Sequence, residues 1–364
     1  MIKFAMLSFS FFHEKPDFSN TTFASFISRF GRAYVTAAEL ALREANFART
    51  KSEVLKQNAE FAAGRSSWWA AINEFADLTD QEFSERKKGL IHVRTNGYNP
   101  AEALPELVKK AATPESMDWR DFSPSIVTPV KDQGNCGSCW AFASTAVIES
   151  HHALYSGTKD LLVLAPQTLV NCAPNPADCG GTGGCEGSIP ELAFNYTSQM
   201  GIALESDLPY TAHDEQCDES VKKAVKVSGY VKLAANSAPE LEAALFSMGP
   251  IAVNVAANWR NYGGGIFSGG CTAINCVLDH VVVATGYAKP SASSEGYWLI
   301  RNSWGASWGE DGYIRLSRKY DETTFLDILP AAGVGCRPFP LTQTVGGESG
   351  LLLDMSYPVG VTVA

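Results

Sequence analysis

The first 135 residues contain no cysteine, whereas the rest of the chain contains nine, from Cys136 to Cys336. The N-terminal third and the remainder of the chain therefore differ in whether disulfides can form within them. An odd number of cysteines leaves at least one thiol free if the others pair. Eight paired cysteines would indicate an oxidising compartment.

Long apolar runs and an excess of positive charge are also missing. No run of about 18 apolar residues occurs, so we expect no transmembrane helix. The formal net charge is −10, which disfavours nucleic acid as the main partner. Residues 1–20 include a short apolar run from Phe4 to Phe12 that fits a signal or leader segment, although no cleavage site is clear. An ordinary apolar segment fits this run equally well.

The pattern of apolar residues divides the chain into three parts. Residues 20–90 are typical of helices, with Thr79 and Glu82 at capping-box spacing. A stretch rich in Pro, Lys and Ala then predicts an extended, cleavable linker over residues 99–116. Helical patterns come next, followed by strand patterns after about residue 225, which predicts an α+β protein with two lobes. The expected helices of the first lobe are 139–154, 165–172 and 189–200.

The segment "KDQGNCGSCWAFAST" carries Cys136 and Cys139 and allows three interpretations: a redox dithiol, half of a metal site, or a nucleophile beside a structural cysteine. A zinc site needs a second close pair of Cys or His, and "CTAINC" and "CGGTGGC" are spaced too widely. We therefore expect no metal and no cofactor. Turn residues followed by a helix-forming run place Cys139 at a helix start, where backbone N–H groups favour a thiolate. This favours the nucleophile.

A thiol nucleophile needs a base, and most of the six histidines are poorly placed for that role. Two of them, His13 and His92, precede the end of the linker. His151 and His152 lie about 18 Å along the helix from Cys139, so we expect them to be solvated residues at a helix end. His213 lies in a polar loop and is expected at the surface.

His280 remains, at the start of the apolar strand "HVVVATGY". By elimination it is the leading base. Asn302 ends a later strand and offers an amide oxygen that can accept the imidazole N–H. Trp304 and Trp308 follow closely and can shield that bond from water.

Three segments together resemble the active-site blocks of papain-like cysteine peptidases: "QGNCGSCWAF", "LDHVVVATGY" and "RNSWGASWGEDGYIRL". That family's motif expects a histidine and an asparagine roughly 130 to 150 residues after the cysteine. His280 lies 141 residues after Cys139, whereas Asn302 lies 163 residues after it, which is somewhat long. The resemblance implies that Cys139 is the nucleophile, His280 the base and Asn302 its orienting group. It also implies an oxyanion hole formed by Gln133 and the Cys139 backbone N–H, and a thiolate–imidazolium pair.

The resemblance extends to the N-terminal part. Glu39, Arg43, Phe47 and Asn58 fall at the spacing of the family's propeptide helix motif, and "AINEFADLT" is similar to a second propeptide motif. This implies an inhibitory propeptide that runs through the cleft in the direction opposite to substrate. The implied organisation is a helical propeptide at 21–112 and a peptidase domain at 113–364, with a mainly helical lobe at 113–225 and a mainly β, barrel-like lobe with an extended tail at 226–364.

The resemblance also implies the disulfides Cys136–Cys185 and Cys172–Cys217. Four cysteines then allow three pairings: Cys179, Cys271, Cys276 and Cys336. The family's usual partner of the Cys271 position corresponds to Ser349 here, so this pairing stays open. The tail between Arg318 and Ser349 is also longer than is usual in the family.

Substrate contacts are likewise implied by position. The pocket for the second residue before the scissile bond has aliphatic walls, which favour an aliphatic or aromatic side chain, and Asp354 at its base would also admit Arg. No His-rich insertion lies between Cys172 and Cys217, which favours an endopeptidase. The implied substrate-binding residues are Ser188, Ile189, Pro190, Asn254, Leu278, Asp279, Trp304 and Asp354.

The sequence thus predicts a monomeric cysteine endopeptidase made as a zymogen, similar to cathepsin L, that acts on peptides and proteins. The resemblance implies an acidic lysosome- or vacuole-like compartment, or secretion. An acyl-transferring ligase or transpeptidase uses the same residues and stays an alternative. A non-catalytic peptide-binding homologue would lack one of the catalytic residues, and all are present. Asn20 and Asn195 begin glycan acceptor triplets.

Overall fold

The structure is a computed structural model that describes residues 15–88, 102–103, 112–157 and 160–364. Most of the possible leader segment and most of the expected linker lie outside the described residues, as does His92. Within the described residues, no helix is long and apolar enough to cross a membrane.

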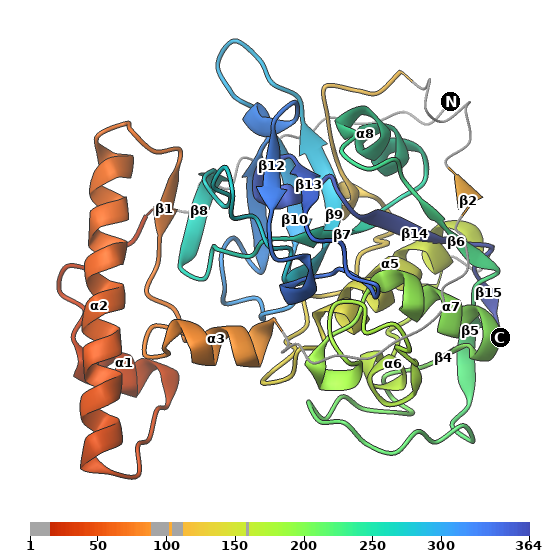
Figure 1. Ribbon diagram of the computed structural model, residues 1–364, viewed down its shortest axis with the longest axis horizontal. Helices are drawn as coiled ribbons and strands as arrows, with labels where there is room; N and C mark the ends of the chain where they lie inside the picture. Colours follow the sequence, from red (N-terminus) through yellow and green to blue (C-terminus); the bar gives the residue numbers. More distant parts are fainter. Residues whose placement is uncertain (1–14, 89–101, 104–111, 158–159) are drawn as a thin grey trace.

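The N-terminal region, which the resemblance assigns to a propeptide, forms a helical arm at one edge of the molecule (Figure 1). It consists of α1 (Phe23–Phe30), α2 (Ala37–Ala62), β1 (Trp68–Ala70) and α3 (Asp80–Lys87). The capping box at Thr79 and Glu82 is present, as predicted. α3 leads from this arm toward the body of the protein.

The first lobe contains the three expected helices. They are α5 (Cys139–Tyr155), α6 (Pro166–Cys172) and α7 (Pro190–Met200). α5 is buried along almost its whole length, because it packs between α7 on one side and strands of the second lobe on the other. A small sheet completes this lobe, with β4 (Ile202–Ala203), β5 (Lys223–Lys226) and β15 (Thr362–Val363).

The second lobe is built on a ten-stranded sheet of described residues in the order β1-β8-β11-β10-β9-β7-β14-β6-β2, with β3 paired to β9. Its longest strand, β9, has antiparallel neighbours β7 and β10. The helix α8 (Ala238–Ser247) lies beside it. The strands are β2 (Glu102–Ala103), β3 (Ser116–Asp118), β6 (Gly229–Lys232), β7 (Ile251–Val255), β8 (Tyr262–Phe267), β9 (His280–Ala288), β10 (Tyr297–Arg301), β11 (Tyr313–Ser317) and β14 (Met355–Val359).

The extended tail forms a hairpin-like excursion from this lobe. β12 (Thr324–Asp327) pairs antiparallel with β13 (Gln343–Gly346). The chain between them includes a short 3-10 helix, Pro330–Ala332. We call residues 330–337 the strap.

The burial of two histidines differs from the expectation. His151 and His152 were expected at the solvent, and both are buried. The reason is that α5 is covered on all sides. His151 Nε2 lies 2.9 Å from the carbonyl oxygen of Pro250, and burial lowers its pKa to about 4. His213 is exposed, as predicted.

Eight cysteines form four disulfides in the described residues. Cys136 bonds to Cys185 and Cys172 bonds to Cys217. The four cysteines whose pairing was open form two disulfides: Cys179–Cys336, which joins distant parts of the chain, and Cys271–Cys276, which closes a short loop. Cys139 keeps a free thiol.

Candidate active site

Cys139 is the first residue of α5 and its side chain is buried. The turn residues of "GNCGS" bring the chain to this point, and the helix begins where the sequence predicted. Backbone N–H groups of Val281 and Trp140 lie against its sulfur. Because Val281 follows His280 in β9, this contact joins the thiol in one lobe to the strand of the other lobe.

His280 begins β9, and its ring is fixed by two neighbours. Its Nε2 lies 2.8 Å from the side-chain oxygen of Asn302, which follows β10. The indole of Trp304 stacks on the imidazole, with ring centroids 4.8 Å apart. Its Nδ1 is buried and has no hydrogen-bond partner among the described residues. Cys139 and His280 line the same pocket.

Gln133 lies in the loop before α5 and is fully buried. Its Oε1 accepts a hydrogen bond from the Ser303 hydroxyl at 2.6 Å, and its backbone N–H donates to the Ser303 carbonyl oxygen at 2.9 Å. The side-chain N–H group therefore has a fixed direction. Its Nε2 donates to the backbone carbonyl oxygens of Lys87 at 3.0 Å and Cys136 at 2.9 Å.

Burial controls the protonation of the thiol and the imidazole. It raises the pKa of Cys139 to about 12, and the backbone N–H groups of Val281 and Trp140 offset only part of that rise. It lowers the pKa of His280 to about 4, although the bond to Asn302 opposes the change. Both groups are therefore neutral in this form of the protein. The thiolate–imidazolium pair that the resemblance implied stays a prediction.

The C-terminal end of α3 reaches the site itself. The Lys87 ammonium lies 3.0 Å from the carboxylate of Asp132, and the Lys88 ammonium lies 2.9 Å from that of Asp279. Phe83 packs edge-on against Trp304, with ring centroids 5.1 Å apart. Sequence reasoning did not single out Lys87 or Lys88, and a backbone carbonyl has no signature in the sequence.

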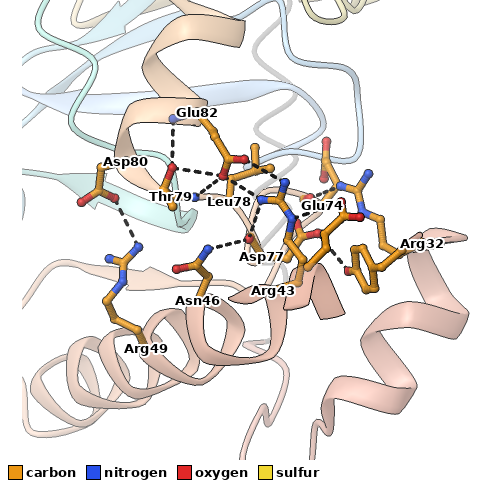
Figure 2. A network of polar contacts seen from close by, with 12 residues as sticks. Arg32, Arg43, Asn46, Arg49, Glu74, Asp77, Leu78, Thr79, Asp80 and Glu82 are labelled. Atoms are coloured by element: carbon orange, nitrogen blue, oxygen red, sulfur yellow. Dashed lines mark hydrogen bonds and ion pairs between the residues drawn. The ribbon is translucent and has the colours of Figure 1, made fainter. Parts of the chain in front are cut away.

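The propeptide is held in shape by a polar network at the crossing of α2 and α3 (Figure 2). Arg43 donates two hydrogen bonds to the Glu82 carboxylate, at 2.7 and 2.8 Å, and Asn46 donates to the Asp77 carbonyl oxygen. Farther along α2, Asn58 bonds in both directions with Ala70 of β1. The motif residues Arg43, Phe47 and Asn58 thus face the interior of the arm.

A second contact attaches the arm to the peptidase part. β1 pairs antiparallel with β8, so this strand of the arm becomes an edge strand of the ten-stranded sheet. Nearby, the Asn73 side chain donates to the Arg260 carbonyl oxygen at 2.7 Å. The arm therefore adheres through a strand, and α3 then directs the chain to the pocket.

Of the five residues expected to form the pocket for the second substrate residue, Leu278 lines the same pocket as Cys139. All five are buried. The Asp354 carboxylate lies 2.7 Å from the Lys232 ammonium, which Glu191 also contacts, so an internal cation already compensates its charge. These residues are Ile189, Pro190, Asn254, Leu278 and Asp354.

The strap was not anticipated as part of the site. Ala332, Gly333 and Val334 line the same pocket as Cys139 and His280, and so do Gly180 and Ser188. The sequence signals were the extra chain length after Arg318 and a cysteine, Cys336, whose pairing was open. Neither signal gave the position of the segment.

The two-lobe fold, the free thiol at a helix start, and the buried imidazole–amide pair define a cysteine protease, and the chain belongs to the papain family. Residues 113–331 match the papain family cysteine protease domain, and residues 23–83 match the cathepsin propeptide inhibitor domain. The protein is a cathepsin L-like cysteine proteinase zymogen that carries this propeptide.

Relatives agree with this assignment. The chain is 36% identical to a cathepsin L-like proteinase of Phaedon cochleariae, over 82% of this chain and 89% of that protein. It is 36% identical to digestive cysteine proteinase 1 of Homarus americanus, over 82% and 90%. The structure of digestive procathepsin L 3 from Tenebrio molitor larval midgut is similar to it, with a TM-score of 0.72, 29% identity, and coverage of 92% and 97%.

Proposed function

We propose that Cys139, His280, Asn302 and Gln133 form the catalytic centre that hydrolyses peptide bonds through a thioester. The observation that carries this proposal is the free thiol of Cys139 in one pocket with His280, whose Nε2 is engaged by Asn302 while Nδ1 has no partner among the described residues. This is the arrangement of nucleophile, base and orienting group that covalent catalysis needs.

The reaction follows from these positions. His280 Nδ1 takes the proton of the Cys139 thiol, and the sulfur attacks the substrate carbonyl carbon. The resulting oxyanion accepts hydrogen bonds from Gln133 Nε2 and from the Cys139 backbone N–H. The imidazolium then gives its proton to the leaving amine as the carbon–nitrogen bond breaks. Water attacks the thioester with His280 as base, which releases the acid and restores the thiol.

The propeptide, residues 21–112, acts as the internal inhibitor of the peptidase domain, residues 113–364. Two contacts support this role: the Lys87 carbonyl on Gln133 and the Lys88 ammonium on Asp279. Substrates are peptides and proteins. The four disulfides and the cathepsin-type propeptide support an acidic lysosome- or vacuole-like compartment or secretion.

Acidification of the purified full-length chain tests this proposal. We expect the chain to shorten near residue 112 and then to react with a thiol-directed inactivator at one residue, Cys139, as read by mass spectrometry. The Cys139→Ala chain should stay full length and unlabelled, with an unchanged circular dichroism spectrum. Peptide hydrolysis by folded Cys139→Ala would refute the assignment.

A further inference from the structure

The strap connects the two lobes beside the nucleophile. On the side of the second lobe, the Val334 backbone N–H donates to the Leu278 carbonyl oxygen at 2.9 Å. On the side of the first lobe, the Gly335 carbonyl oxygen accepts from Gly180 N–H at 3.2 Å, and Arg337 N–H donates to the Ala177 carbonyl oxygen at 2.9 Å. The strap thus adds a short backbone bridge across the seam in which Cys139 lies.

Two side-chain connections hold the strap to the first lobe. The disulfide Cys179–Cys336 ties its end to the loop before α7. Next to it, the Arg337 guanidinium lies 3.2 Å from the Asp178 carboxylate, and both side chains are almost fully buried. A covalent bond beside a buried ion pair keeps this segment in place when the propeptide leaves, because neither connection involves a propeptide residue.

The strap also fits tightly against the second lobe. A Cβ atom at Gly333 would collide with the backbone oxygen of Leu278, so only glycine allows this approach. The next side chain, Val334, is buried in one apolar cluster with Ile189 and Leu278. These two are walls of the pocket that the family resemblance assigned to the second residue before the scissile bond.

We propose that the strap fills this second-residue pocket, with Val334 in the place of a substrate side chain. This inference rests on the proposed catalytic role of Cys139. The mature enzyme then selects peptides whose second residue before the scissile bond is small, Gly or Ala. A bulky side chain there must displace Val334 from a packed apolar cluster, and the strap is covalently tethered against such displacement.

A series of blocked fluorogenic dipeptides tests the proposal, with Arg before the scissile bond and Gly, Ala, Leu or Phe preceding it. For the acid-activated wild-type protein we expect kcat/KM for Gly and Ala to exceed that for Leu and Phe at least tenfold. Preference for Leu or Phe by the wild type would overturn the proposal. This outcome needs no variant, so it decides the question even where a strap variant folds poorly.

Two variants locate the effect in the strap. The Cys179→Ser/Cys336→Ser protein should shift its preference toward Leu and Phe at least tenfold, because the tether is lost. Val334→Ala should raise kcat/KM for Leu at least threefold with the tether intact. The matched control, Cys172→Ser/Cys217→Ser, removes a disulfide of the same lobe that does not touch the strap, and its preference should stay that of the wild type.

The two proposals fail in different ways. Hydrolysis that survives in Cys139→Ala counts against the catalytic assignment alone. If the Cys179→Ser/Cys336→Ser and Val334→Ala proteins both keep the wild-type preference at the second residue before the scissile bond, the proposal for the strap fails. This result counts against that proposal alone, because hydrolysis by both variants still depends on Cys139. An equal shift in the Cys172→Ser/Cys217→Ser control also overturns the strap, since general loosening then explains the change.

Discussion

The side-chain amide of Gln133 donates a hydrogen bond to the backbone carbonyl oxygen of Lys87 at 3.0 Å. A carbonyl of the propeptide therefore lies on the donor that we assign to the oxyanion of the reaction. The propeptide carbonyl occupies this donor before any substrate arrives. The Ser303 hydroxyl fixes the orientation of the Gln133 amide, which therefore points the same way toward the propeptide carbonyl and toward a substrate oxyanion.

This shared donor predicts a loss of turnover in Gln133→Ala. Because the hydrogen bond strengthens as charge develops on the substrate oxygen, kcat should fall about 10²- to 10³-fold with little change in KM. Steady-state kinetics of the acid-activated protein against one peptide substrate measure both constants. Gln199→Ala, which removes an exposed amide of α7, is the control and should match the wild type. A kcat for Gln133→Ala within threefold of the wild type would contradict the assignment.

The protonation state of the zymogen predicts a reactivity switch at Cys139. Burial raises the pKa of this thiol to about 12, so very little thiolate exists near neutral pH. Alkylation by iodoacetamide should therefore be slow in the zymogen at pH 6 to 8 and should rise with pH up to the alkaline limit of folding. We expect removal of the propeptide to reduce the desolvation of the thiol and to raise the rate at pH 6 at least about a hundredfold.

Mass spectrometry of the labelled peptide measures this rate residue by residue. The inactive form is obtained without processing by keeping the chain at neutral pH. Equal alkylation rates before and after processing would show that the propeptide does not control the thiol.

The parts of the fold that follow from local pattern were predictable. The start of α5 at Cys139, the start of β9 at His280 and the capping box at Thr79 each depend on neighbouring residues, and all three are present. The two-lobe α+β fold with its helical propeptide is likewise confirmed.

Features that depend on distant partners were not predictable. β1 has three residues and no periodic pattern, and it forms a strand only because β8 offers an edge. The burial of His151 follows from the position of α5 inside the protein, since nothing in its own segment indicates it. The pairing of Cys179 with Cys336 joins residues 157 positions apart, which sequence spacing alone does not fix.

The ion pair between Arg43 and Glu82 predicts how the propeptide responds to acid. The Arg43 hydrogen bonds lower the pKa of Glu82 from its ordinary value of 4.5 to about 2. A depressed carboxyl pKa stabilises the folded state above the unfolded value, and this stabilisation is lost as pH falls through the folded value. The arm should therefore lose stability between pH 4.5 and 2, with no contribution from this pair to the pH dependence above that window.

Thermal unfolding of the inactive Cys139→Ala zymogen between pH 2 and 7 checks this expectation without self-cleavage. Adding Glu82→Gln should lower the unfolding temperature of the arm at neutral pH and reduce its change between pH 4.5 and 2. Glu85→Gln on the same helix has no contact with Arg43 among the described residues and is the control. An identical pH profile with and without Glu82→Gln would rule out this pair as an acid-sensitive contact.

The aromatic contact between Phe83 and Trp304 predicts how strongly α3 holds the zymogen closed. Phe83 is buried against the indole that also stacks on His280, so its ring joins the propeptide directly to the site. Truncation of a buried Phe to Ala costs about 3–5 kcal/mol. Phe83→Ala should therefore weaken docking and raise the rate of processing at pH 6 at least tenfold, as followed by gel electrophoresis of the full-length chain. Phe26→Ala, which removes a buried ring from the propeptide's own cluster, is the matched control and should raise the rate less. Equal rates for the two variants would show that latency depends on the stability of the arm and not on this contact with Trp304.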